Sequence, residues 1–302
     1  MKPTLLVLAA GMGSRYGSLK QIDPVGPSGE TIIDYSIFDA IRAGFGKVVF
    51  IIRKSFEQDF KDIFISKLQP HISVEYVFQE IENIPEGLTI SPERTKPWGT
   101  AHAILMAKDV IKEPFAVING DDFYGSGAFQ TMADYLVSLT PDQQNQYSLV
   151  GYQVGNTMSE NGTVSRGVCL ADEQSFLASV TERTNIQYTH GGIAYTDSDN
   201  EFVFLKPETL VSMNFWGFTP EYFRQTEPMF VDFIKENNDS LKAEFYIPSA
   251  VDSLVSSKKA KVKVLKSNAK WFGVTYKEDK PLVIEKLAQL IKSGVYPAHL
   301  WK

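Results

Sequence analysis

The residues with the clearest chemical potential lie near the start of the chain, in a glycine-rich loop that directly follows an apolar run. The run at residues 5–8 is typical of a buried parallel strand. Gly11 and Gly13 allow the backbone to turn tightly, so that its free N–H groups form a concavity for a bulky anion. Arg15 and Lys20 place two positive charges beside it. The loop therefore predicts a phosphate-binding site.

Three further groups of polar residues stand at the ends of predicted elements. Gln79 ends a predicted strand, and Gly99 and Thr100 open a predicted helix whose N-terminus would favour an anion. Asp121 and Asp122 follow another strand, and carboxylates are the ligands that Mg²⁺ prefers beside phosphate oxygens. Together these residues are the parts that nucleotide chemistry needs.

The elements between these residues determine whether they can meet. Apolar runs predict strands over 47–53, 73–79 and 114–119, and helical spacing predicts helices over 31–44, 56–68 and 99–111. Strands that alternate with helices imply a parallel sheet with right-handed crossovers, whose ligands bind beyond the carboxyl ends of the strands. All the candidate residues fall at that edge. The long segment 80–98 is expected to be a functional loop or lid.

The pattern changes near residue 148, where short strands joined by polar turns replace the alternation. They predict mixed or antiparallel sheet built onto the first half, followed by further helices and one late strand. The predicted segments are strands over 148–154, 164–170, 176–182, 201–204, 212–218 and 261–265, a helix that starts at Thr219-Pro220-Glu221 with the proline in its first turn, and helices over 245–257 and 281–293.

No linker separates the two halves, so one domain over 1–302 with a continuous sheet is expected. It comprises a nucleotide half (1–145), a second half (146–279) and a C-terminal helix (280–302). The fold class is α/β, with a Rossmann-like, mostly parallel mixed sheet flanked by helices.

Composition excludes several classes of function. The chain has 302 residues and a net charge of −6, which argues against a surface for duplex nucleic acid. The single cysteine, Cys169, allows no internal disulfide or cysteine metal cluster. No apolar run is long enough to span a bilayer, and the first run leads into the glycine loop rather than a cleavage site, so a cytoplasmic protein is expected. The C-terminal helix leaves open whether the chain forms a homo-oligomer.

The first motif, Leu8-Ala9-Ala10-Gly11-Met12-Gly13-Ser14-Arg15 followed by Lys20, resembles that of the sugar-1-phosphate nucleotidyltransferases, or NDP-sugar pyrophosphorylases. Their usual form is L-A-A/G-G-x-G-x-R and then P-K; here the lysine is present and the proline is not. The resemblance implies that Ala10, Gly11 and Gly13 bind the nucleotide, with Arg15 and Lys20 as catalytic cations.

Later motifs follow in the same order. Gln79 matches a glutamine on the base edge in pyrimidine-selective members, and Gly99-Thr100 resembles the G-T-A/G-x-A helix start near base and ribose. Asp121 matches the G-D element, whose aspartate binds the catalytic divalent cation, and Asp122 is a second ligand or a turn cap. His102 is expected to be structural.

The sugar side of the resemblance lies in the second half. Gly167 matches the Y-G-V element, Glu182 and Arg183 match V-x-E-K-P, and Asn214 falls in the N-x-G-x-Y element. The resemblance implies that these four residues bind the sugar and its phosphate. Trp216 is expected to be a core residue.

Two departures concern the metal. Ser249 stands where relatives usually carry a second metal-binding aspartate in a T-D-A-x-D-like context. Residues 271–275, Trp-Phe-Gly-Val-Thr, resemble the W-x-D-x-G-T element, again with a small residue where aspartate is common.

The expected function is therefore transfer of a nucleoside monophosphate from an NTP, UTP or dTTP by the Gln79 argument, to a sugar 1-phosphate, with Mg²⁺ as cofactor. One alternative is CMP transfer to an alcohol phosphate such as phosphocholine, for which the aromatic second half, with Phe215 and Trp216, suits a choline-like cation. Another is a non-catalytic nucleotide-sugar sensor or regulatory subunit, which Ser249 favours. A glycosyltransferase would leave Arg15 and Lys20 without a role.

Overall fold

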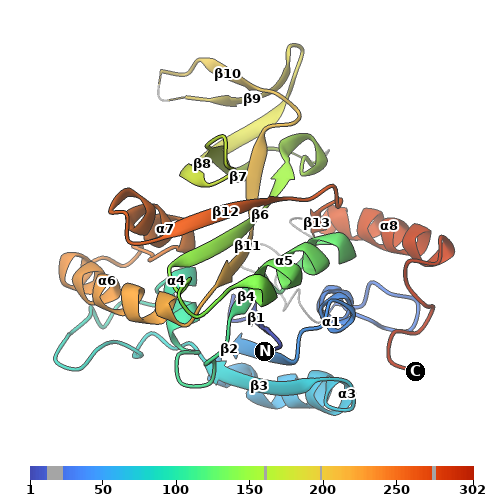
Figure 1. The fold of residues 1–302 in the computed structure, drawn as a ribbon, viewed down its shortest axis with the longest axis horizontal. Coiled ribbons are helices and arrows are strands. Elements are labelled where there is room, and N and C mark those ends of the chain that lie inside the picture. The colour runs from blue at the N-terminus through green and yellow to red at the C-terminus, as the bar shows by residue number, and fades with distance from the viewer. Residues whose placement is uncertain (12–22, 160–161, 198, 274–276) are drawn as a thin grey trace.

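A computed structural model describes residues 1–11, 23–159, 162–197, 199–273 and 277–302. In this part of the chain, eleven strands form one sheet and two short strands form a separate pair (Figure 1). The order along the main path is β10-β9-β8-β7-β11-β4-β1-β2-β3. Off this path, β6 pairs with β11, and β12 pairs with β6. The predicted fold class is confirmed: the first half contributes parallel strands, and the second half continues the same sheet.

The parallel part consists of the strands predicted from apolar runs. β1 (Thr4–Leu8) lies between β2 (Lys47–Ile52) and β4 (Phe115–Asn119), and β3 (Ser73–Phe78) pairs outside β2. β1, β2 and β4 are almost entirely buried, as parallel strands covered on both faces must be.

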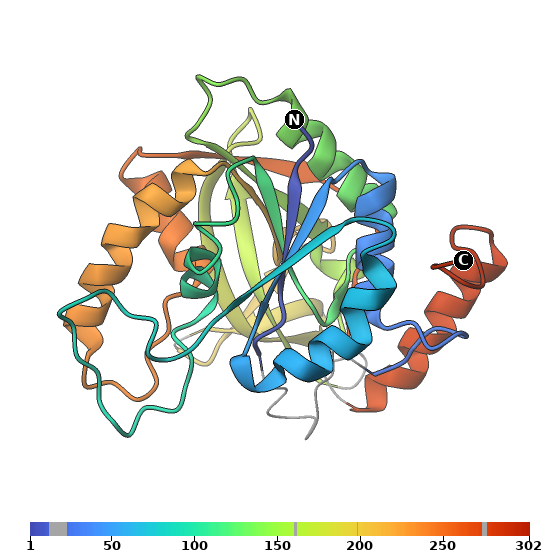
Figure 2. The same ribbon diagram turned by 90° about the horizontal axis from the view of Figure 1, so that it is seen from below.

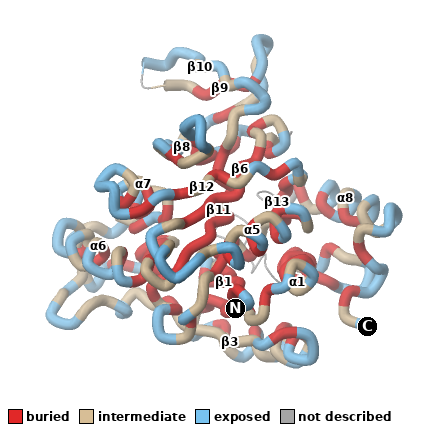
Figure 3. The backbone as a smooth tube through the Cα atoms, in the orientation of Figure 1, coloured by how far each residue is buried: buried red, intermediate tan, exposed pale blue. Residues whose placement is uncertain are grey.

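The second half joins this sheet through β11 (Leu210–Phe218), which pairs antiparallel with β4 and also contacts β6 and β7. The outer antiparallel strands project as an arm at the top of Figure 1, and Figure 3 shows its tip largely exposed. The remaining strands of the sheet are β6 (Gln146–Gln153), β7 (Val164–Ala171), β8 (Leu177–Thr189), β9 (Gly192–Thr196), β10 (Phe202–Leu205) and β12 (Lys261–Lys266).

Helices cover both faces of the sheet (Figure 2). One face packs against α1, α2, α3 and α5, and the opposite face packs against α4, α6 and α7. These helices are α1 (Ile32–Arg42), α2 (Glu57–Phe60), α3 (Ser66–Leu68), α4 (Thr100–Leu105), α5 (Ser126–Ser138), α6 (Glu221–Asn237) and α7 (Ile247–Ser256). A third core forms where α8 (Lys280–Lys292) packs over the small pair β5 (Asp122–Phe123) and β13 (Phe272–Gly273).

Several boundaries differ from the sequence predictions. α4 ends at Leu105 rather than near residue 111, because the following N–H groups bond three residues back and tighten the chain into turns. β8 continues to Thr189, so that the third predicted strand of the second half is much longer than expected. Pro220 is the N-cap of α6 rather than its first helical residue. The sequence analysis also missed α5 and β9.

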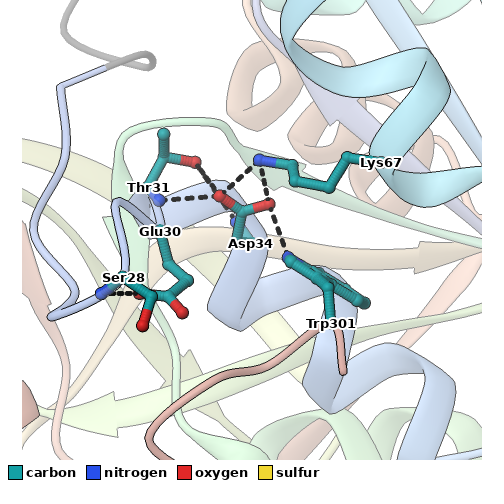
Figure 4. Close-up of polar contacts among 6 residues, drawn as sticks. All are labelled: Ser28, Glu30, Thr31, Asp34, Lys67 and Trp301. Carbon is teal, nitrogen blue, oxygen red and sulfur yellow. Dashed lines mark hydrogen bonds and ion pairs between the residues drawn. The ribbon is translucent and has the colours of Figure 1, made fainter.

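The C-terminal segment returns to the first helix. Asp34, in the first turn of α1, is fully buried, and its carboxylate accepts a hydrogen bond from the N–H of the N-cap Thr31 at 2.7 Å. Lys67 of α3 forms an ion pair with it at 2.6 Å, and the indole N–H of Trp301 donates to it at 3.1 Å (Figure 4). Elements that are far apart in sequence therefore meet at one carboxylate.

The helices of the described residues include none that is both long and apolar enough to cross a membrane.

Candidate functional site

The carboxyl ends of β1, β2, β3 and β4 lie at one edge of the sheet, as predicted. The N–H of Gly120, after β4, donates to the carbonyl of Leu8 at the end of β1, with an N···O distance of 3.0 Å. Ala10 is buried at this edge and Gly11 is exposed. The turn that carries Asp121 is thus attached to the strand that leads into the glycine loop.

Three of the predicted nucleotide-binding residues, Gly13, Arg15 and Lys20, fall in residues 12–22 and lie outside the described residues. Their roles stay predictions.

Gln79 and Gly99 are brought into direct contact. The side-chain amide nitrogen of Gln79 donates to the carbonyl of Gly99 at 3.0 Å and lies 3.1 Å from Nδ1 of His102. Nε2 of His102 faces the carbonyl of Asn83 at 2.8 Å and must carry the ring proton, so Nδ1 accepts. Burial lowers the pKa of His102 to about 4, which keeps the ring neutral. Both N–H bonds of the Gln79 amide are therefore used within the protein, and its oxygen is the atom left for a ligand.

The start of α4 is built around Gly99 and Thr100. Gly99 has φ +97°, and a Cβ at this position would lie 2.6 Å from the carbonyl oxygen of Phe245, so only glycine fits. The hydroxyl of Thr100 accepts from the N–H of Ile247 at 3.1 Å and so caps the first turn of α7. The predicted nucleotide-binding helix start is thereby fixed against the segment that precedes α7. His102 is fully buried and stacks on Phe230, which fits the structural role expected for it.

Asp122 is the centre of a hydrogen-bond network at the end of β4. Its Oδ2 accepts from the side-chain amide of Asn119 at 2.9 Å and lies 3.3 Å from the hydroxyl of Tyr124, whose single proton is shared with the carbonyl of Met213 at 3.0 Å. The Asn119 side-chain oxygen in turn accepts from the amide of Asn214 on β11 at 2.7 Å. The network fixes the Asp122 carboxylate by neutral donors.

The charges around Asp122 oppose one another. Desolvation and the neighbouring carboxylate of Asp121 raise the pKa of Asp122 to about 7, while Asn119, Tyr124 and the charge of Arg166 lower it. Within the described part of the chain no lysine or arginine lies within ion-pair distance of Asp122. Neighbouring carboxylates, one of them oriented by neutral donors, are a donor set that could hold a cation.

Arg166 was not among the predicted site residues, and the structure places it beside them. It is 9 % exposed, donates to the hydroxyl of Thr157 at 3.2 Å, and lies 4.7 Å from the ring centroid of Trp271. Burial lowers the pKa of Arg166 to about 10, and the charges of Asp122 and Glu182 oppose this shift. The signal in the sequence was an arginine at the place where the Y-G-V element has tyrosine.

The predicted sugar-binding residues are partly brought together. Gly167 of β7 stands opposite Glu182 of β8 on one side and opposite Ser212 of β11 on the other. Desolvation raises the pKa of Glu182, and the charge of Arg166 opposes this rise. Glu182 and Arg183 are successive residues of β8, so their side chains point to opposite faces of the sheet. The guanidinium of Arg183 lies 4.8 Å from the centroid of the Tyr195 ring, and Arg183 is therefore not brought together with Glu182.

Asn214 has a structural role in addition to the one predicted for it. It adopts φ +64° at an irregularity in β11, and its amide oxygen accepts from the indole N–H of Trp216 at 2.9 Å. With one N–H donated to Asn119, the second is the group that remains for a sugar. Phe215 and Trp216 are fully buried, so the expectation that they could face a choline-like cation is wrong.

Two other features bear on the site. A cavity of about 780 Å³ lies between the start of α5, the segment after β12 and α8, and none of the predicted site residues lines it.

Among the described residues, no three histidine, cysteine, aspartate or glutamate side chains gather into a metal-binding group. Ser249, at the expected position of a second metal ligand, is exposed on α7. Asp121 and Asp122 could hold a divalent cation together with phosphate oxygens of a substrate, which is a normal donor set for Mg²⁺.

Comparisons with known proteins agree with the sequence resemblance. The UTP–glucose-1-phosphate uridylyltransferase of Haloferax volcanii is 21% identical over 287 residues, which cover 94% of this chain and 96% of the relative. Among solved structures, the inositol-1-phosphate CTP transferase from T. maritima superposes with a TM-score of 0.63 at 14% identity, covering 96% of this chain and 97% of that chain. A UDP-glucose pyrophosphorylase complexed with UDP-glucose gives a TM-score of 0.58 at 17% identity, covering 96% and 99% of the two chains.

The family model described as nucleotidyl transferase matches residues 4–275. That range includes the glycine loop, Gln79, the Asp121-Asp122 turn and the strands of the second half. The chain belongs to the nucleotidyl transferase family.

Proposed function

We propose that this protein transfers a nucleoside monophosphate from an NTP to a sugar 1-phosphate and releases pyrophosphate. The observation that carries the proposal is the meeting of three predicted nucleotide elements at one sheet edge: the end of β1, the Gln79–Gly99 contact and the Asp121-Asp122 turn. The similarity to a uridylyltransferase over nearly the whole chain supports the same reaction class.

In this reaction an oxygen of the sugar phosphate attacks the α-phosphorus of the NTP. A new O–P bond forms while the bond between the α-phosphorus and the pyrophosphate oxygen breaks. The nucleophile is already an anion, so no protein base is required, and the protein contributes positioning and charge neutralisation. Arg15 would neutralise the leaving pyrophosphate and Lys20 the charge at the α-phosphate. Arg183, the residue predicted for the sugar phosphate, lies against Tyr195 and would have to leave that ring to reach it.

Asp121 and Asp122 would hold Mg²⁺, which would supply positive charge against the negative charge of the phosphates during transfer. The fit rests on the two adjacent carboxylates and on the neutral donors that fix Asp122. Asn119 and Tyr124 orient this carboxylate without cancelling its charge.

The base is proposed to be a pyrimidine, uracil or thymine, read by Gln79. Because the amide nitrogen of Gln79 is bound to Gly99 and His102, its oxygen presents an acceptor to the base. The imide N–H of uracil or thymine is a matching donor.

A second candidate keeps the reaction class and changes the acceptor to an alcohol phosphate, with CTP as donor. The fold similarity to an inositol-1-phosphate CTP transferase favours including it. The amino group of cytosine would also match an acceptor at Gln79.

The test is a pyrophosphate-release assay of the purified full chain with Mg²⁺, using four NTPs against several sugar 1-phosphates, phosphocholine and inositol 1-phosphate. We expect release with UTP or dTTP and a sugar 1-phosphate, and faster release than with GTP or ATP. Equal rates with all NTPs would contradict the role of Gln79. Release only with CTP and an alcohol phosphate would select the second candidate. No release with any pair, together with thermal stabilisation by a nucleotide sugar, would favour the sensor.

A further inference from the structure

The short strands β5 and β13 place Gly273 directly opposite Asp122. A Cβ built at position 273 would lie 2.6 Å from Oδ1 of Asp122 and 3.1 Å from the ring of Trp271. The first distance is well below van der Waals contact. The volume that a side chain at position 273 would enter is therefore already occupied by the Asp122 carboxylate.

This carboxylate cannot turn aside easily. Its other oxygen accepts hydrogen bonds from Asn119 and Tyr124, and Asn119 is itself held by Asn214 of β11. Rotation of the Asp122 side chain away from β13 would break this network, which is worth more than its separate bonds. Oδ1 is thus held on the side of Gly273 by contacts from β4, β5 and β11.

The sequence pattern gives this juxtaposition a meaning. Trp271-Phe272-Gly273 resembles an element in which aspartate is common at the third position, and in this chain that position is glycine. A carboxylate reaching from position 273 and one reaching from position 122 would fill the same volume, so the site has room for only one of them.

We infer that Asp122 supplies the second carboxylate of the cation site from β5, in the space that Gly273 leaves open, and that positions 122 and 273 can exchange this role. The inference rests on the proposed function, since it assigns atoms to the cation of that reaction. It makes Gly273 a positioning residue and explains why a serine at position 249 need not leave the site incomplete.

The experiment is a Mn²⁺ titration of the full chain without nucleotide, followed by electron paramagnetic resonance of free Mn²⁺ and by water proton relaxation. Asp122→Asn should weaken Mn²⁺ binding by about tenfold or more. Asp122→Ala should weaken binding to the same extent and vacates the volume for a new carboxylate, so Asp122→Ala combined with Gly273→Asp should restore binding toward the wild-type value. Asp59→Asn, the same change at an exposed residue of α2, should leave binding unaltered.

Two alanine variants keep the test valid if the double variant does not fold. Gly273→Ala should weaken Mn²⁺ binding, because its methyl group displaces Oδ1 of Asp122, whereas Gly127→Ala, in open space on α5, should not. Circular dichroism and the thermal midpoint establish that each tested variant is folded. Wild-type affinity in Asp122→Asn or Gly273→Ala, a folded Asp122→Ala/Gly273→Asp variant that binds no better than Asp122→Ala, or a wild-type chain that binds no Mn²⁺ would overturn the inference.

Pyrophosphate release separates this inference from the proposed function. In one outcome, the variants at positions 122 and 273 change Mn²⁺ affinity as predicted while the wild-type chain releases no pyrophosphate with any substrate pair. That result would uphold the inference and reject the proposed function. Pyrophosphate release by a chain whose Mn²⁺ affinity does not depend on these residues would do the reverse.

Discussion

Two aspartates, Asp34 of α1 and Asp122 of β5, are both held by hydrogen bonds, yet their surroundings differ in charge. Asp34 is fully buried and is balanced by the ammonium group of Lys67 at 2.6 Å, with further donors from Thr31 and Trp301 (Figure 4). Asp122 is held by the neutral donors Asn119 and Tyr124 and lies beside a second carboxylate.

This difference separates a structural carboxylate from one that is available to a ligand. A buried charge with a full set of partners stabilises the particular arrangement of elements that supplies those partners. A carboxylate that is oriented by neutral groups beside a like charge gains most when a cation binds. The first kind should respond to mutation in stability, and the second kind in activity.

The largest expected effect is loss of turnover in Asp121→Asn. Removing this carboxylate should lower kcat by about 100-fold or more, because it takes away a group that acts on the charge developing during transfer. The thermal midpoint should change little by comparison, as expected for a group whose role lies in the transfer step. Steady-state pyrophosphate release and a thermal melt measure both quantities, and near-normal turnover would contradict the proposed role.

The next effect concerns the structural carboxylate. Lys67→Met leaves Asp34 buried without its cationic partner and should lower the free energy of unfolding by about 2 to 3 kcal/mol, less than for a fully buried pair because Lys67 is partly exposed. Turnover per folded molecule should be unchanged. Lys61→Met, which breaks an exposed pair with Glu57, is the matched control and should change little. Urea denaturation of the three proteins measures this, and equal stabilities would remove the distinction between the two carboxylates.

A smaller effect is expected at the end of the chain. Trp301→Phe keeps an aromatic ring beside Phe38 and removes the N–H that donates to Asp34, so that the free energy of unfolding should fall by about 1 to 2 kcal/mol. If this N–H stabilises the Asp34 carboxylate, Trp301→Phe should lower the free energy of unfolding by less in an Asp34→Asn background than in the wild type. An undiminished loss in that double-mutant cycle would show that Trp301 acts only through packing.

The smallest effect in the wild-type chain is the net pH dependence of its stability, because two opposing contributions largely cancel. The pKa of His102 is lowered to about 4 by burial, so its contribution to stability is lost as the pH falls from about 6.5 to about 4. The pKa of Asp39 is raised to about 6, mainly by burial, so its contribution is lost as the pH rises from about 4 to about 6. The two slopes oppose each other, each by at most about 1.4 kcal/mol per pH unit.

Replacing either group should expose the slope of the other. Between pH 4 and 6, His102→Gln should make the slope of the unfolding free energy against pH more negative than in the wild type. Asp39→Asn should make the same slope more positive. Urea denaturation at several pH values measures the slopes. Parallel curves for all three proteins would contradict both pKa shifts.

The parts of the fold and site that local patterns determine were predictable. Buried runs gave β1, β2, β3 and β4, and glycine and polar residues at strand ends placed Gln79, Gly99 and Asp121 at one edge. α5 was missed because Gly125, Ser126 and Gly127 interrupt its start, although its buried residues recur at helical spacing: Ala128, Phe129, Met132, Ala133 and Leu136.

The contacts that tune the site depend on chain segments that meet only in the folded structure. Asn119 and Asn214 are 95 residues apart, and nothing near either residue indicates that their amides join. The same holds for Gly273 and Asp122, whose relation comes from the pairing of β13 with β5. Arg166 was visible as a departure from a motif, but its contacts with Thr157 and Trp271 required the folded structure.

The most direct test of the central claim is the stoichiometry of products formed by the wild-type chain from UTP and glucose 1-phosphate with Mg²⁺, followed by ³¹P nuclear magnetic resonance. We predict that a nucleoside diphosphate sugar and pyrophosphate appear in equal amounts, and that neither product forms when the Asp121→Asn variant replaces the wild-type chain. Formation of UDP with inorganic phosphate, or of pyrophosphate at the same rate without any phosphorylated acceptor, would contradict nucleotidyl transfer to a sugar phosphate.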